Sequence, residues 1–441
     1  MMKKLLVFAL AVLMSLPVLA VCGARAEAVT IRFIDVSPGP VRQTYFEDIF
    51  KKFEAETGTT VQYESVPWDD AANKLTALGA TGQLPDVMTT WAGWLGQFVP
   101  AGWVVPLDGY IAGKEGEFTD YVNQVVWAGE KENYGHIFTV PDGMMVKGIY
   151  YRKDWCAEAG VSFGDNWTYD DFFTMVEKLY DGDKRHYGNS YRGARGAFDP
   201  LMVCLQTFTG GRTYDDQGNC LLNKPECIEA FKKWTNIYLG GYVPKDSINW
   251  GFVEMVDNFT GGLTGTIIND SEVAATCITT MQPDQWGVMP MPVSAVDGKR
   301  LNTVNSPYAY TVSGQSKNPD AAFQLIEYLT RPDINIEYCK LTGLIPIKKG
   351  VGDDPLYGPD GPYAAFVKQL NDPALVIPTL YGPFDITDMH QGMLHEEVQK
   401  YLLGQQSAED ALNRISNELT KRMKEYLKDN PSSVIETPKT L

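Results

Sequence analysis

Histidine, paired cysteines and catalytic motifs are scarce or absent in this sequence. Its 441 residues include four histidines and seven cysteines, and no two cysteines have the C-x-x-C spacing of a metal site. No Gly-x-Ser-x-Gly, His-Glu-x-x-His or phosphate-binding-loop pattern occurs, and His395-Glu396-Glu397 lacks the second histidine of a zinc motif. We therefore expect no catalytic site, no metal ion and no cofactor. The 55 acidic residues leave a glycosidase-type carboxylate pair as the alternative.

Positive charge and long apolar runs are also limited. Lys and Arg number 38 against 55 Asp and Glu, which gives a net charge of −17. Affinity for nucleic acid rests on Lys and Arg contacts with phosphates, so we expect no nucleic-acid partner. After residue 26, no stretch of about 18 apolar residues remains that could span a membrane.

The first 26 residues have the pattern of an export signal. Lys3 and Lys4 precede an apolar run from Leu5 to Val21, and Ala24-Arg25-Ala26 supplies a small-x-small cleavage site. We expect this segment to be removed and the mature protein to be exported in soluble form. The alternative is a lipid anchor at Cys22, although the residue before such a cysteine is usually small and here is Val21.

One pair of cysteines in the chain could form a disulfide. An exported protein meets an oxidising compartment, where disulfides form. Beyond the export signal, Cys220 and Cys227 are the only cysteines close together in sequence. One interpretation is a Cys220–Cys227 disulfide, and the other is a pair of buried free thiols.

Aromatic residues make up 12% of the chain, and two tryptophans follow a short predicted strand. Apolar β-type residues recur in three short runs, which are residues 29–33, 61–63 and 87–90. Helical periodicity separates these runs, so the order predicts an α/β fold with a parallel sheet. Ligands bind at the carboxyl ends of such strands, where Trp91 and Trp94 follow the third strand and Ser37 and Arg42 follow the first. The competing interpretation is that both tryptophans pack in the core.

Five local patterns recur in a fixed order along nearly the whole mature chain. They are residues 53–58 (FEAETG), 82–87 (GQLPDV) with 101–107 (AGWVVPL), 149–154 (IYYRKD), 316–322 (SKNPDAA) and 343–346 (GLIP). In this order, behind an export signal, the sequence resembles the extracellular sugar-binding proteins of ABC importers, of the maltose-binding-protein type.

The resemblance implies a two-lobed periplasmic-binding-protein fold of type II, with a ligand cleft between lobes that a multi-segment hinge joins. Lobe one is expected to contain residues 29–140 and 297–341, and lobe two residues 141–296 and 342–441. Closure of the lobes would bury the ligand. The implied function is to capture a sugar or oligosaccharide in the periplasm and deliver it to the membrane permease of an ABC transporter. We expect a monomer that performs no chemistry.

A sugar presents apolar faces, which aromatic rings cover, and hydroxyl groups, which polar and charged side chains bind. The expected ligand-binding residues of lobe one are Trp91, Trp94, Ser37, Arg42 and Tyr308, and Asp142 is expected beside them near the first hinge crossing. Those of lobe two are Phe198, Trp250, Asn269, Asp270, Phe384, Asp388 and Gln391. The competing interpretation is a turn before a helix at residues 201–208 for Phe198, and core packing for Trp250. No tryptophan stands at the helix start near Asp388, where maltose-binding relatives carry one, and this departure argues against a maltodextrin.

Two other functions remain open. A receptor for a polyol or a glycerol-phosphate ester would use the same fold, but an anionic head group needs a cluster of Arg and Lys, and Arg42 is the only such side chain that the sequence places in the cleft. A secreted carbohydrate-active enzyme is the alternative from another class. Turnover of chromogenic glycosides would identify that enzyme.

Overall fold

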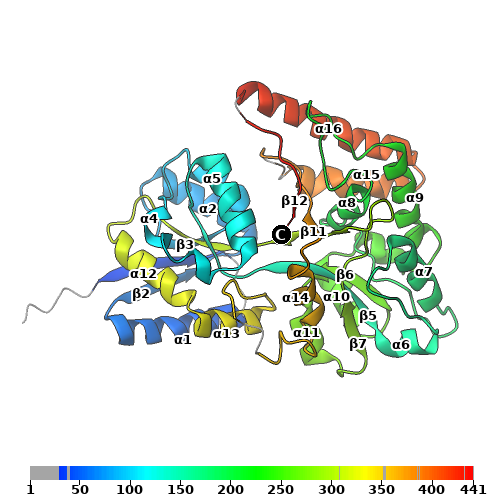
Figure 1. Ribbon diagram of the computed structural model, residues 1–441, viewed down its shortest axis with the longest axis horizontal. Coiled ribbons are helices and arrows are strands. Elements are labelled where there is room, and N and C mark those ends of the chain that lie inside the picture. Colours follow the sequence, from blue (N-terminus) through cyan, green and yellow to red (C-terminus); the bar gives the residue numbers. More distant parts are fainter. Residues whose placement is uncertain are drawn as a thin grey trace, which may run out of the picture.

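The chain folds into two α/β lobes that lie side by side (Figure 1). The computed structural model describes residues 29–36, 40–306, 308–350, 354–384, 386, 388–431 and 433–440. The predicted export signal, the alternative lipid site at Cys22 and the candidate Ser37 lie outside these residues.

Lobe one is built on a sheet with the order β2-β1-β3-β10-β4. Its strands are β1 (Thr30–Asp35), β2 (Thr60–Ser65), β3 (Val87–Thr90), β4 (Val140–Pro141) and β10 (Ala309–Val312). β1 is parallel to β2 and β3, whereas β10 is antiparallel to β3 and β4. The predicted strand–helix–strand–helix–strand order is confirmed, and its two crossovers are α1 (Pro40–Thr57) and α2 (Trp68–Ala80).

Helix α1 covers the sheet because its apolar residues recur every three or four positions. Phe46, Ile49, Phe50 and Phe53 are each at most 5% exposed. The rings of Phe46 and Phe33 of β1 lie 5.1 Å apart between centroids. This contact fixes the amino end of α1 next to the carboxyl end of β1.

Short helices complete lobe one, and Figure 1 shows α2, α4 and α5 above its sheet and α1 and α13 below it. Their bounds are η1 (Ala92–Trp94), α3 (Leu95–Phe98), α4 (Asp108–Ile111), η2 (Glu115–Glu117), η3 (Val122–Trp127), α5 (Ala128–Tyr134), α12 (Pro319–Leu329) and α13 (Pro332–Thr342). β10, α12 and α13 come from a segment that returns to this lobe after the chain has built much of the other.

Lobe two has a sheet with the order β6-β5-β7 and a smaller one with the order β12-β11-β8. The strands are β5 (Met145–Arg152), β6 (Thr266–Asp270), β7 (Trp286–Met289), β8 (Arg300–Leu301), β11 (Leu375–Ile377) and β12 (Lys439–Thr440). The helices are α6 (Lys153–Glu158), α7 (Tyr169–Leu179), α8 (Phe198–Gln206), α9 (Pro225–Leu239), η4 (Lys245–Asn249), α10 (Phe252–Thr260), α11 (Val273–Thr280), α14 (Ala364–Leu370), η6 (Met389–Met393), α15 (Leu394–Leu402) and α16 (Ala408–Asp429).

Two helices of lobe two begin at side-chain caps. The Thr168 side chain accepts from the Asp171 backbone N–H, and Asp171 Oδ2 accepts from the Thr168 backbone N–H at 2.7 Å, so a capping box opens α7. Ser407 likewise accepts from the Asp410 backbone N–H at 3.0 Å and opens α16.

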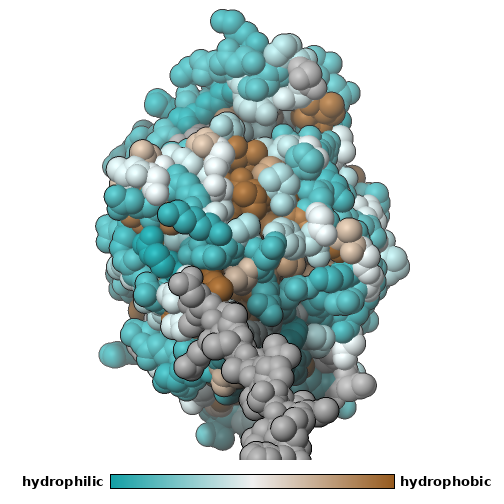
Figure 2. Space-filling model, turned by 90° about the vertical axis from the view of Figure 1, so that its left-hand side faces the viewer, coloured by the Kyte–Doolittle hydropathy of each residue, from teal (hydrophilic) through white to brown (hydrophobic). Residues whose placement is uncertain are grey.

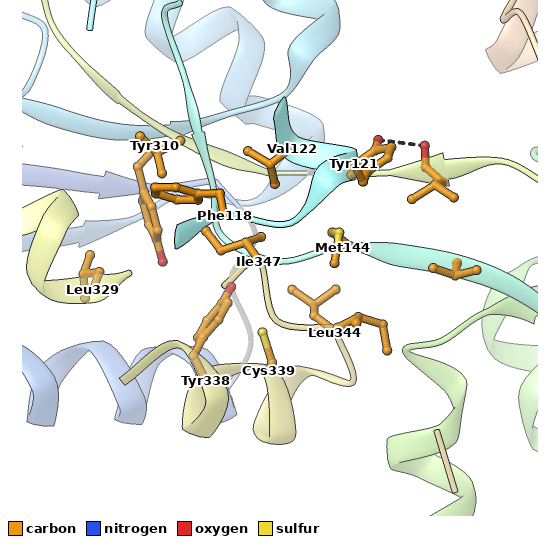
Figure 3. Packing of buried hydrophobic residues seen from close by; sticks show 14 of the residues in the cluster. Phe118, Tyr121, Val122, Met144, Tyr310, Leu329, Tyr338, Cys339, Leu344 and Ile347 are labelled. Atoms are coloured by element: carbon orange, nitrogen blue, oxygen red, sulfur yellow. Dashed lines mark hydrogen bonds between the residues drawn. The ribbon is translucent and has the colours of Figure 1, made fainter. Parts of the chain in front are cut away.

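In the part of the chain that the structure describes, three segments cross between the lobes. Strand β5 starts antiparallel to β9 (Val304–Asn305), with Met145 opposite Asn305. Met144 pairs with Ile345 of the third segment. Figure 3 shows Met144, Leu344 and Ile347 packed between these segments, and the Tyr121 hydroxyl donates to the Val304 carbonyl at 2.8 Å. The crossing is therefore a packed, hydrogen-bonded joint.

The end of the chain returns to this joint. Strand β12 lies antiparallel to β11, which is parallel to β8 just before the second crossing segment. Lys439 Nζ lies 4.0 Å from Glu132 Oε2 of α5 in lobe one. The last strand of lobe two is thus tied to lobe one.

The predicted Cys220–Cys227 disulfide is not formed, and this interpretation is corrected. Both thiols are free and buried in the core of lobe two. Cys227 Sγ lies 3.5 Å from the Leu205 carbonyl oxygen and 3.7 Å from the Leu221 carbonyl oxygen. The start of α9 thus directs this thiol into the core.

The outer side of lobe one, seen in Figure 2, is mostly hydrophilic, with a narrow strip of hydrophobic side chains near its upper middle. Among the described helices, none has both the length and the apolar character needed to cross a membrane.

Candidate ligand-binding site

Three of the predicted residues meet at one edge of the lobe-one sheet. Trp91 directly follows β3, and the antiparallel register pairs Thr90 with Ala309, which puts Tyr308 opposite Trp91. The Asp142 backbone N–H donates to the Tyr308 carbonyl at 3.2 Å. Trp91 and Tyr308 are both half-buried. The edge beside the joint therefore has two aromatic side chains in neighbouring positions.

The Trp91 ring lies flat against Gly93. A Cβ atom at Gly93 would come within 2.2 Å of that ring, so only glycine permits the contact. Trp94 is also half-buried, but its ring packs 6.0 Å from that of Phe98, at the margin of a core cluster. The Trp103 ring also packs against Phe98, at 5.5 Å between centroids. Of these tryptophans, Trp91 is the one at the edge.

Arg42 and Asp142 face each other inside lobe one. Arg42 Nη2 lies 2.7 Å from Asp35 Oδ1, and Arg42 Nη1 lies 3.3 Å from Asp142 Oδ2. The Tyr338 hydroxyl contacts Arg42 and donates to Asp142 Oδ2 at 2.7 Å. Asp35 and Asp142 are fully buried, and burial raises the pKa of Asp142 to about 6 against the opposing effect of Arg42. Arg42 thus pairs with two buried carboxylates, a role that differs from the predicted ligand contact.

The guanidinium of Arg42 also lies beneath the edge. It stands 5.3 Å from the centroid of the Tyr308 ring, a cation–π distance. Asn335 Nδ2 donates to the Asp142 carbonyl at 2.7 Å, which ties α13 to the first crossing segment. This buried network holds β1, α1, α13 and the joint in one arrangement.

In lobe two, the predicted pair Asn269–Asp270 ends β6 as expected. Asp270 Oδ2 lies 2.7 Å from Lys147 Nζ on the neighbouring strand β5. Asn269 Oδ1 accepts from the Asp270 backbone N–H at 2.7 Å. Asn269 Nδ2, Asp270 Oδ1 and Ser271 Oγ are buried with no hydrogen-bond partner among the described residues. A strand end with unfilled polar atoms can accept a ligand.

Charged side chains that the sequence analysis missed gather around Asp270. We define the lobe-two polar cluster as Lys147, Arg192, Arg195, Asp199, Asp270 and Glu272. Burial raises the pKa of Glu272 to about 7, Asp270 adds to this shift, and Lys147 and Arg192 oppose it. Burial lowers the pKa of Arg192. These shifts arise because the groups share a confined space at the start of β5 and the end of β6.

The cluster is fixed by its neighbours. Asp199 accepts from the Tyr381 hydroxyl at 2.6 Å, and His390 Nε2 lies 3.2 Å from its other oxygen. The Arg192 guanidinium rests on Gly196, where a Cβ atom would lie 2.5 Å from Arg192 Cζ. The sequence held one signal for this cluster, the RGARG segment at residues 192–196. Two arginines in a glycine-containing loop favour contact with a hydrogen-bond acceptor.

Two predicted ring contacts in lobe two are corrected to core packing. Phe198 is 1% exposed, because α8 starts there and turns this side chain inward, while its neighbour Asp199 faces the cluster. Trp250 is 6% exposed, and its Nε1 donates to Asp246 Oδ2 at 3.1 Å within the same turn. Both rings stabilise the lobe.

The remaining predicted residues lie near the start of η6. Phe384 packs against the lobe-two core and lines a groove of about 410 Å³ along α16. Asp388 is exposed and accepts twice from Arg422, at 2.7 and 2.6 Å. Gln391 Oε1 accepts from Arg195 Nη1 at 3.2 Å, so it contacts the lobe-two polar cluster. The described residues contain no group of His, Cys, Asp and Glu arranged to hold a metal ion.

Comparison with known proteins gives one family and many similar folds. The sequence model of the bacterial extracellular solute-binding proteins matches residues 38–336, more than half of the chain. A protein of Brucella abortus strain 2308, named only as a binding protein, is 25% identical over 86% of this chain and 90% of its own length. The maltotriose-binding protein of Pyrococcus abyssi is 27% identical over 67% of this chain and 61% of its own length.

Solved structures share the two-lobed arrangement. Maltose-bound MalE3 of T. maritima has a TM-score of 0.74 at 22% identity, over 90% of this chain and 100% of its own. A solute-binding protein of Agrobacterium vitis with bound D-mannitol has a TM-score of 0.68 at 21% identity, over 90% of this chain and 99% of its own. The type II periplasmic-binding-protein fold expected from the sequence is therefore confirmed.

Proposed function

The chain belongs to the family of bacterial extracellular solute-binding proteins, and we propose that it captures a sugar or a polyol between its lobes for an ABC importer. The observation that carries this proposal is the pairing of an aromatic edge with a polar strand end across one joint. Trp91 and Tyr308 stand on lobe one, and Asp270 and Arg192 on lobe two.

The two sides suit the two kinds of surface on a sugar. Trp91, lying flat on Gly93, offers a ring face for the C–H face of a pyranose. Asp270, held by Lys147, offers a charged acceptor for hydroxyl groups, and Arg192 offers charged donors. Neither side alone covers a small ligand, so affinity rises when the lobes close on it.

Closure would occur about the three crossing segments. We take residues 29–140 and 297–341 as one moving unit and residues 141–296 and 342–441 as the other, except that Pro141 of β4 moves with the lobe-one sheet and β8 moves with lobe two. The buried network around Arg42 keeps lobe one rigid up to the joint. The closed form then presents the ligand to the permease subunits in the membrane, and a monomer acting in the periplasm suffices for this role.

The protein performs no chemistry in this proposal. An enzyme would need an acid and a base or nucleophile poised on the substrate. The charged groups of the lobe-two polar cluster are instead engaged with one another, as Lys147 is with Asp270 and His390 with Asp199. Steady release of chromophore from aryl glycosides, lost on changing Asp199 or Asp270, would contradict this reading.

Polyols are the second candidate ligand, because two proteins of similar structure have a polyol bound. The Agrobacterium vitis protein has D-mannitol bound, and one from Agrobacterium radiobacter has ribitol. Polyols share the hydroxyl pattern of sugars but lack a rigid ring face, so they would depend less on Trp91.

A thermal-shift screen of the purified mature protein tests the proposal. The panel contains mono-, di- and trisaccharides, mannitol, ribitol and glycerol 3-phosphate. A ligand that binds only the folded state stabilises it by about 2.7 kcal/mol at 100 times its Kd, which gives a clear rise in Tm. A rise with amino acids or peptides, and with no carbohydrate or polyol, would refute the substrate class.

A further inference from the structure

Above pH 7, where Glu272 is mostly ionised despite its raised pKa, the charges of the lobe-two polar cluster nearly balance. Among its described residues, the cations Lys147, Arg192 and Arg195 stand against the carboxyl groups of Asp199, Asp270 and Glu272. His390 adds a further titratable group, which is engaged with Asp199 at 3.2 Å. The cluster therefore presents no strong net field of either sign to a ligand.

The cluster also has donors and acceptors left over. Arg192 Nε is buried with no hydrogen-bond partner, and so is Asp270 Oδ1. The other oxygen of Asp270 is taken by Lys147 at 2.7 Å, which keeps this carboxylate in place. A buried polar atom without a partner costs free energy, so a ligand that supplies the partner is bound more tightly.

The two residues on either side of Asp270 also have buried polar atoms without hydrogen-bond partners. Asn269 is 5% exposed and Ser271 is 0% exposed, and Asn269 Nδ2 and Ser271 Oγ have no hydrogen-bond partner in the described structure. The unfilled positions are thus of both kinds, donors on Asn269, Ser271 and Arg192 and an acceptor on Asp270.

We infer that this cluster binds the hydroxyl groups of an uncharged ligand and selects against sugars that carry a carboxylate, a phosphate or an ammonium group. A hydroxyl group both donates and accepts, so one or two hydroxyl groups fill an acceptor on Asp270 and a donor on Arg192 together. The inference rests on the proposed function and narrows it from carbohydrates in general to neutral sugars and neutral polyols.

Charged ligands are expected to bind more weakly because each meets like charges in the cluster. An anionic group beside Arg192 would also lie close to Asp270, Glu272 and Asp199, and the like charges repel it. An ammonium group placed at Asp270 would meet Lys147 and Arg192 in the same way. Burial weakens the screening of these repulsions by water, so they discriminate strongly.

Matched ligand sets test the inference by titration calorimetry at pH 7.5. Each neutral sugar or polyol that binds is compared with its uronic acid or aldonic acid, its 2-amino-2-deoxy sugar and its phosphate ester. We expect each charged analogue to bind at least tenfold more weakly than its neutral parent. A charged analogue that binds more tightly than its parent would overturn the inference and leave the proposed function standing. Failure of every carbohydrate and polyol would instead overturn the proposed function.

Two variants assign the selectivity to the cluster. Asp270→Asn removes one carboxylate, so the cluster gains net positive charge, and Glu272→Gln does the same without breaking an ion pair. We expect Asp270→Asn to weaken binding of the neutral ligand at least tenfold, because it removes the acceptor. Either change should lower the ratio of the acid's Kd to the neutral ligand's Kd at least tenfold. Asp216→Asn, which breaks only the exposed ion pair with Arg212, is the matched control and should leave the ratio unchanged. A folded Glu272→Gln protein with an unaltered ratio would overturn the assignment.

Discussion

Replacing Arg42 by methionine separates a structural role for this residue from a ligand-binding one. Arg42 is 8% exposed and is the cation that faces Asp35 and Asp142, both 0% exposed. Without it, both buried carboxylates lose the countercharge that Arg42 supplies. Removing one partner of a buried ion pair costs roughly 3–5 kcal/mol, because the remaining charge is desolvated and unpaired.

This cost should appear as a lower melting temperature of the ligand-free protein. For a unit of this size, 1 kcal/mol shifts Tm by about 2–4 °C, so we expect a fall of roughly 6–20 °C for Arg42→Met. Arg331→Met is the matched control, because Arg331 also pairs with two carboxylates of lobe one but is 40% exposed in its side chain. Exposed pairs contribute about 0–1 kcal/mol, so its Tm should change by no more than about 4 °C.

A third variant checks the cause. Neutralising both acids together with the arginine, as Asp35→Asn/Arg42→Met/Asp142→Asn, should recover part of the lost stability, because it removes the unpaired charges. An Arg42→Met protein that melts within 2 °C of the wild type and no longer binds its ligand would refute this reasoning. Arg42 would then be the ligand contact that the sequence suggests.

Three further predictions concern single side chains. Trp91→Ala should weaken ligand binding at least tenfold in titration calorimetry with little change in Tm, and unchanged affinity would return this ring to the core. Burial raises the pKa of Glu130 to about 7, although hydrogen bonds from Phe138 and Thr139 oppose the shift. Because this folded-state pKa exceeds the ordinary 4.5, the proton-linked stability is full below pH 4.5 and is lost as the pH rises through 7, a change of about 3 kcal/mol. Glu130→Gln should remove that loss in urea unfolding at pH 5 and pH 8, and an equal pH dependence in both proteins would contradict the assignment. Thr168→Ala should cost about 1 kcal/mol in urea unfolding through loss of the cap of α7, and an unchanged midpoint would show that the cap contributes nothing.

The edge of lobe one was predictable because its signals are local. The run from Val87 to Thr90 ends in β-type residues, and Trp91 follows at once, so the strand and the position of the ring come from adjacent residues. The same holds for α7, whose capping box is formed by Thr168 and Asp171, three positions apart. Local pattern specifies where an element starts and which residue stands at its end.

The groups around these elements were harder to predict because they meet through the fold. Tyr338 contacts Arg42 across 296 positions of sequence, and Lys147 meets Asp270 across 123. Sequence spacing cannot report such pairs. Phe198 shows a finer failure, because α8 begins at this residue and turns its ring into the core, whereas the neighbouring Asp199 stays outside the core.

The position of β12 has a practical consequence for working with this protein. The described chain ends at Thr440, in a strand that pairs with β11 and lies beside α5 of the opposite lobe through Lys439 and Glu132. Under the proposed closure, a bulky domain attached beside β12 would lie next to both lobes and hinder their movement. A small environment-sensitive dye attached near Lys439 would instead report whether a ligand changes the contact between the lobes.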